Sequence, residues 1–136
     1  MNGIMVELIL WTDNPNIDIN KISQIIGIFP VEQESIDDIK HYGELKNLKR
    51  NIDVSSLMYS TDYIDTTEVD YALKKMINII EPKLCILYNV VNKYSLKAKL
   101  CVVIDLPEVP IIEISSRFIQ IMANLSAEIE FDTYIG

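Results

Sequence analysis

The sequence predicts a two-layer α+β domain, in which three helices pack on one face of a mixed, mainly antiparallel β-sheet. Two hydrophobic patterns support this fold class. Apolar residues alternate in several short runs, as in half-buried strands, and elsewhere recur every three to four residues, as in helices. The helical runs lie between strand-like runs, and 49% of the 136 residues are hydrophobic, which is enough for one core. A single domain over residues 1–136 is therefore expected.

The first strand and the first helix follow directly from these patterns. Residues 3–11 alternate in polarity and predict a strand, and the polar run 12–16 predicts a turn. A helix is expected to begin after Asp18, whose short carboxylate suits an N-cap, and to end at Gly27, where a positive φ costs little. Its inward stripe consists of Ile19, Ile22 and Ile26.

The next segment is less regular. Residues 28–34 predict a short edge strand, because Pro30 cannot donate a hydrogen bond to a central ladder. Residues 35–52 are polar and predict a long surface loop with a basic cluster. Residues 53–62 predict the next strand. The residues of the loop that bear on function are His41, Tyr42, Lys46, Lys49 and Arg50.

The second helix has the clearest pattern in the sequence. Thr67 and Asp70 resemble a capping box, and Pro82 is expected to end the helix. The inward stripe consists of Val69, Leu73, Met76, Ile77 and Ile80.

A β-hairpin is expected from the two apolar runs that follow. Residues 84–92 and 98–106 are rich in β-branched residues and are joined by a short polar connection. Cys85 and Cys101 would lie on its two arms, and we expect both to remain free thiols.

A third helix and a last strand complete the chain. Ser115 or Ser116 would cap the helix, with Ile119, Met122 and Ala123 facing inward. Residues 127–135 alternate in polarity and predict the last strand, with Ile129 and Phe131 in the core.

Charge and cysteine content exclude several classes of function. The formal net charge is −8 and the sequence pI about 4.5, so phosphate backbones and anionic membrane surfaces are poor partners and basic proteins are favoured. Such a charge also serves solubility. The N-terminus lacks the pattern of a signal peptide, because Glu7 and Asp13 interrupt its apolar residues. Two cysteines are too few for a disulfide framework, so a cytoplasmic location is expected.

Catalytic groups are scarce. His41 is the only histidine, and it falls in the irregular loop. The sequence contains neither a phosphate-binding glycine motif nor a C-x-x-C pair. We therefore expect no enzymatic activity, no cofactor and no metal site.

The last strand contains the one ordered set of carboxylates. Glu128, Glu130 and Asp132 share a face with Tyr134, and alternate residues of a strand lie roughly 6.5–7 Å apart. A Ca²⁺ or Mg²⁺ ion would need further ligands from another element. This spacing also falls in the range of an inverting glycosidase pair, but it has little specificity. The alternative interpretation is the solvated face of a half-buried strand.

Tyrosines form a second candidate group. Tyr59 and Tyr63 lie in or near the middle strand, and with Tyr134 they offer ring surface with a polar tip, which suits a binding surface. They also suit the rim of an ordinary core.

Six stretches of the chain carry a family resemblance: residues 26–30, 43–44, 59–63, 80–83, 92–96 and 127–134, of which the closing Asp132-Thr133-Tyr134 is the most specific. Together they resemble a bacterial protein family known as domain of unknown function 4279. Two residues depart from the family pattern: Leu57 stands where the family usually has tryptophan, and Asp62 where it often has glycine. The family name carries no activity, so the resemblance implies a fold and a bacterial cytoplasmic protein.

Three functional hypotheses remain. The first is a protein that binds a basic macromolecular partner, as small acidic immunity proteins bind toxins. The second is a module that binds a small molecule or a divalent metal through the carboxylate strand and nearby tyrosines. The third, an enzyme with an unfamiliar site, is disfavoured because no nucleophile and base are paired in the sequence.

Overall fold

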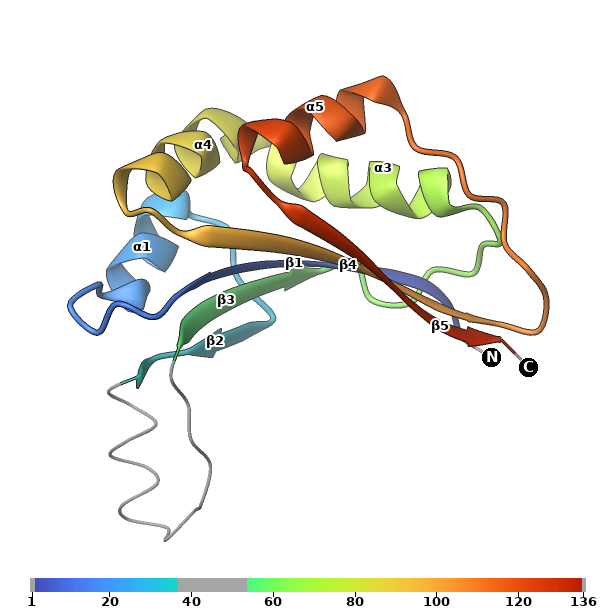
Figure 1. Ribbon diagram of the computed structural model, residues 1–136, viewed down its shortest axis with the longest axis horizontal. Coiled ribbons are helices and arrows are strands. Elements are labelled where there is room, and N and C mark those ends of the chain that lie inside the picture. Colours follow the sequence, from blue (N-terminus) through green and yellow to red (C-terminus); the bar gives the residue numbers. More distant parts are fainter. Residues whose placement is uncertain (1, 37–53, 136) are drawn as a thin grey trace, which may run out of the picture.

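The structure, a computed structural model, describes residues 2–36 and 54–135 and confirms the predicted α+β fold class. Among these residues the sheet has the strand order β2-β3-β1-β4-β5, in which only β4 and β5 are parallel (Figure 1). The elements are β1 (Gly3–Thr12), α1 (Ile19–Ile26), β2 (Glu32–Glu34), β3 (Ser55–Ser60), α3 (Val69–Ile80), the 3₁₀ helix η1 (Glu81–Lys83), α4 (Leu84–Lys93), β4 (Lys97–Leu106), α5 (Ser116–Asn124) and β5 (Glu128–Ile135).

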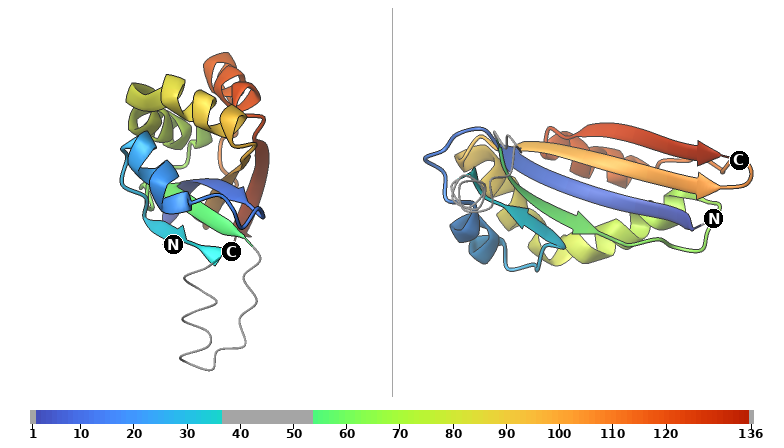
Figure 2. Two further views of the ribbon diagram at one scale, coloured as in Figure 1. Left: turned by 90° about the vertical axis from the view of Figure 1, so that its left-hand side faces the viewer. Right: turned by 90° about the horizontal axis from the view of Figure 1, so that it is seen from below.

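The α-helices cover one face of the sheet. Every second residue of β1 from Ile4 onward is buried, whereas the residues between them are only partly buried. The buried side chains of β1, β3 and β4 join those of the helices in one hydrophobic core. Seen from the side without helices, the five strands lie in a row with β5 and β2 at the two edges (Figure 2).

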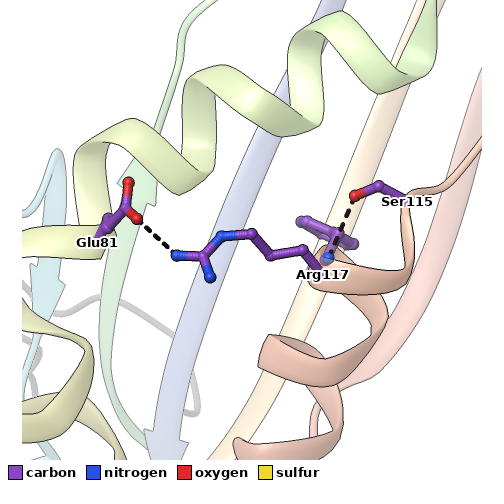
Figure 3. Close-up of polar contacts among 4 residues, drawn as sticks. Glu81, Ser115 and Arg117 are labelled. Carbon is purple, nitrogen blue, oxygen red and sulfur yellow. Dashed lines mark hydrogen bonds and ion pairs between the residues drawn. The ribbon is translucent and has the colours of Figure 1, made fainter.

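Two helices begin where predicted. The Asp18 carboxylate accepts hydrogen bonds from Asn20 N and Lys21 N, and Gly27 ends α1 with φ 76°. Ser115 caps α5 by accepting a hydrogen bond from Phe118 N, and Arg117 Nη2 lies 2.5 Å from Glu81 Oε1, which joins α5 to η1 (Figure 3).

The start of α3 differs from the prediction. Its N-cap is Glu68, whose side chain makes no capping hydrogen bond, so the expected capping box is wrong. Thr66 Oγ1 instead accepts a hydrogen bond from Glu68 N. The end of the helix at Ile80, just before Pro82, is confirmed.

The predicted hairpin is wrong, because residues 84–93 form α4 instead of a strand. Leu87, Val90 and Val91 are buried at helical spacing, and Pro82 is the second residue of the 3₁₀ helix η1 that leads into this helix. Cys85 is therefore exposed on a helix, whereas Cys101 lies on β4. A short apolar run fits a buried helix as well as a strand, which is why its periodicity did not decide between them.

Two further core predictions fail near the C-terminus. In α5 the buried residues are Phe118, Ile121 and Met122, whereas Ile119 is 52% exposed. Ile129 and Phe131 lie on the helix side of the sheet, but each remains 39% exposed. The reason is that β5 is an edge strand, and side chains at an edge have neighbours on one side only.

Several predicted features fall outside the described residues. They are His41, Tyr42, Lys46, Lys49 and Arg50 of the predicted surface loop. Among the helices that the structure describes, none has the length and apolar character needed to cross a membrane.

Candidate functional site

The sheet face without helices is the candidate site, and we call it the outer face. It is formed by every second residue of each strand. The strand registers place Glu7 opposite Cys101, Cys101 beside Glu130, and Val103 beside Asp132. The described residues of this face are Met5, Glu7, Ile9, Trp11, Glu32, Glu34, Ser56, Met58, Ser60, Lys97, Lys99, Cys101, Val103, Asp105, Glu128, Glu130, Asp132 and Tyr134.

Four of the predicted site residues lie together on this face. Parallel pairing aligns Glu128 with Lys99 and Tyr134 with Asp105, so both side chains point away from the helices. Glu130 and Asp132 lie between them on the same side of β5. The prediction that the three carboxylates share a face with Tyr134 is therefore confirmed.

The two remaining predicted residues, both tyrosines, separate. Tyr63 is 40% exposed and precedes Ile64, which bridges the core residue Ile4, so alternation directs Tyr63 toward the outer face. Burial together with the charges of Asp105, Glu7 and Asp132 raises its pKa. Tyr59 lies on the opposite side of β3 and is 1% exposed, so it belongs to the core. Burial raises the pKa of Tyr59 to about 12, and its hydroxyl has no hydrogen-bond partner among the described residues.

The two departures from the family pattern have different consequences. Leu57 is fully buried in the core, so a change there alters packing and not the outer face. Asp62 adopts φ 57°, a left-handed conformation that glycine adopts without strain and that aspartate tolerates. The glycine expected at this position therefore suits the same backbone.

Glu7 is the central acidic group that the sequence did not single out. Burial raises its pKa, and the charges of Glu32 on β2 and Asp132 on β5 raise it further. Carboxylates from the two edge strands therefore act on one side chain of the middle strand. Such crowding of like charge gives the outer face a negative potential that attracts cations.

Polar contacts already order part of the face. Lys99 pairs with Glu130, and the Tyr134 hydroxyl donates a hydrogen bond of 3.0 Å to Asp132 Oδ2. At the other end, Lys97 Nζ lies 4.6 Å from the centroid of the Trp11 ring. The aromatic residues thus flank the carboxylates, with Tyr63 and Tyr134 toward one end and Trp11 toward the other.

The outer face also carries a thiol whose reactivity is lowered by its surroundings. Cys101 is its one thiol, and burial together with Glu130, Glu7 and Asp132 raises the pKa of that thiol. A thiol with a raised pKa is a weaker nucleophile near neutral pH, because less of it is thiolate. In the described part of the chain, no three histidine, cysteine or acidic side chains are grouped as metal ligands would be.

A cleft of about 600 Å³ lies elsewhere, between α1 and the segment that leads to β2. Polar side chains of α1 line one wall, and Phe29, which is 97% exposed, lies at its border. Gln33 donates a hydrogen bond to Asn20 across it. The sequence offered no sign of this cleft, because its walls come from a helix and a non-helical segment without a shared motif. Its lining consists of Asn20, Ser23, Gln24, Gly27, Ile28, Phe29, Pro30 and Gln33.

Replacing Glu7 with glutamine is expected to raise the melting temperature near neutral pH. The pKa of Glu7 is raised in the folded state, so ionisation of this side chain disfavours folding. The protonated Glu7 side chain favours the folded state fully below its ordinary pKa of 4.5. This contribution is lost as the pH rises through the raised pKa of the folded state. The gain from the glutamine variant should therefore shrink as the pH is lowered through 4.5.

Thermal unfolding followed by circular dichroism over this pH range measures the effect. Glu108→Gln, at an exposed loop position, is the matched control and should change little. A Glu7→Gln variant that is less stable than the parent near neutral pH would contradict the inferred crowding of charge.

Comparison with known proteins identifies one relationship. The sequence model of a family described as Domain of unknown function (DUF4279) matches residues 2–136. No curated protein and no solved structure matches the chain.

Proposed function

This chain belongs to the family Domain of unknown function (DUF4279), whose description names no activity, and we propose that it is a non-catalytic recognition domain that binds a basic protein through the outer face. The proposal places it in the bacterial cytoplasm. A small acidic immunity protein that binds a basic toxin is the nearest functional analogy.

One observation carries the proposal. The outer face gathers carboxylates from β1, β2 and β5, with no described helix covering it, and two lysines of β4 are its described cations. A field of one sign speeds the encounter with a partner of opposite sign and excludes partners of like sign. The exposed rings of Tyr63 and Tyr134 add contact area that charge alone does not supply.

The test is a pull-down from the native organism at low salt and at about 0.5 M salt, where surface charges are screened within a few ångström. We expect one specific basic protein to be retained at low salt and to be lost as salt rises. The double variant Glu128→Lys/Glu130→Lys should abolish retention. The matched control is Glu108→Lys/Glu113→Lys, which changes the net charge equally at exposed positions outside the face. Equal loss with both double variants would show that only total charge matters and would refute a specific site.

The second candidate function is binding of a small molecule, and the cleft beside α1 favours it. Its volume is within the usual range for ligand pockets, and its amide side chains offer both donors and acceptors. A thermal-shift screen of metabolites, with Ca²⁺ and Mg²⁺ included, separates the two functions. Stabilisation by a small ligand or ion, with no protein retained at either salt, would favour this second candidate.

A further inference from the structure

β5 is a long sheet edge whose charged residues are all acidic. It has eight residues, and among the described residues it pairs only with β4. About every second residue of an edge strand directs its N–H and C=O groups away from the sheet, where they can pair with another chain. From Glu128 to Ile135 there is no proline, lysine or glycine. Natural edges are usually shortened, bulged or blocked by such residues.

The opposite edge shows that protection. β2 has only three residues, and Pro30 lies just before it. A partner strand would therefore find little backbone to pair with at β2, whereas β5 offers an uninterrupted ladder. The right-hand view of Figure 2 shows β5 along one side of the sheet for most of its length.

The two faces of β5 differ in chemistry. On the helix side Ile129 and Phe131 are each 39% exposed, which leaves apolar surface beyond the reach of the core. On the outer face Glu128 and Glu130 are exposed and Asp132 is half-buried. A strand added to this edge would place its side chains alternately beside the apolar pair and beside the carboxylates.

A second copy of this chain is a poor occupant. Antiparallel pairing of β5 with itself about Glu130 would set Glu128 against Asp132 and Glu130 against its own copy. Like charges directly opposite one another destabilise a strand pair. The same acids would instead pair favourably with lysine or arginine, so the edge is selective for a strand of opposite charge.

We propose that β5 accepts, as an additional strand, an extended segment of the partner in which basic and apolar residues alternate. The inference rests on the proposed recognition of a basic protein and specifies how that protein is bound. Backbone hydrogen bonds to the edge supply attraction that is independent of sequence, and the alternating side chains supply selectivity. Basic residues lie on the outer face, and apolar residues contact Ile129 and Phe131.

The probe is a peptide as long as the eight residues of β5, in which lysine and valine alternate. Its affinity is measured by fluorescence anisotropy at low salt. Two derivatives are N-methylated at the backbone of every second residue: one at all lysines, the other at all valines. Because alternate residues of a strand direct their N–H groups to opposite edges, each derivative has one of its two edges blocked. We expect one derivative to bind at least about tenfold more weakly than the other, because only one peptide edge faces β5. Equal affinity of the two derivatives would overturn the proposal.

Amide hydrogen exchange gives an independent readout. The unmodified peptide should slow exchange within Glu128–Ile135 and leave Glu32–Glu34 unchanged. Protection, in the peptide-free protein, of those β5 amides that point away from β4, together with a dimer in sedimentation, would mean that a second copy occupies the edge and would also overturn the proposal.

These outcomes separate the two proposals. If the N-methylated peptides bind equally while the pull-down still depends on Glu128 and Glu130, the outer face binds its partner without strand addition. If the pull-down retains no basic protein, the proposed function fails as well.

Discussion

Replacing Phe118 with alanine is expected to lower the free energy of unfolding by about 3–5 kcal/mol, the usual cost of removing a buried phenylalanine side chain. Phe118 lies on the inward face of α5 and is fully buried, so its removal leaves a cavity that the surrounding helices and sheet close only in part. Urea unfolding followed by circular dichroism measures the change.

Phe131→Ala is the matched comparison, because the residue type and the substitution are the same. Phe131 is 39% exposed at the sheet edge, so the truncation removes less buried surface and creates no closed cavity. We expect a cost of about 1–2 kcal/mol, scaled from the buried apolar area. If Phe131→Ala costs as much as Phe118→Ala, β5 is covered in solution, and the edge is not open to a partner.

Phe131 and Phe118 also show what could not be predicted from the sequence. Alternation correctly placed Phe131 on the apolar side of the last strand, but it does not reveal strand order. Only the order β2-β3-β1-β4-β5 shows that β5 is an edge, and therefore that its apolar residues remain half-exposed. Phe118 was missed because the phase of its helix was predicted incorrectly. In α5 the predicted stripe began one residue too late, and a one-residue error in phase rotates a helix face by about 100°.

The outer face was predicted only in part, because a local pattern does not reveal which strands are neighbours. Period-two spacing is a local property, so Glu128, Glu130 and Asp132 could be placed together from sequence. Glu7 joins them only because β4 lies between β1 and β5, a neighbour relation that no local pattern contains. Tyr59 and Tyr63 are four residues apart and would share a face in a regular strand. The left-handed residue Asp62 between them breaks that alternation, so Tyr59 lies in the core and Tyr63 near the outer face.

The second large effect is expected from Gly3→Ala, which should destabilise the protein by about 2–4 kcal/mol through backbone strain and collision. Gly3 has φ 103°, a conformation that residues with a side chain rarely adopt. A Cβ at this position would lie 2.0 Å from Ile64 O and 2.9 Å from Ile64 C. Both are backbone atoms, so no rotation of a side chain relieves the contact.

Hydrogen bonds hold the colliding segment in place. Ile4 N donates to Ile64 O at 3.0 Å, and Ile64 N donates to Ile4 O at 2.8 Å, so the start of β1 must separate from residue 64 to admit a methyl group. Chemical denaturation measures the loss of stability, and faster amide exchange at Ile4 and Ile64 would locate it.

Gly27→Ala is the control for the conformational part of this cost. Gly27 also has a positive φ, of 76°, but the nearest atom to an added Cβ is Lys83 Nζ at 3.6 Å, at the end of a flexible side chain. Only the left-handed conformation is penalised there, at about 1–2 kcal/mol. The difference between the two variants therefore contains the collision with the Ile64 backbone together with the added strain of the larger φ at Gly3. Equal costs would mean that the chain relaxes around Gly3 and that the pairing of β1 with residue 64 is not needed for stability.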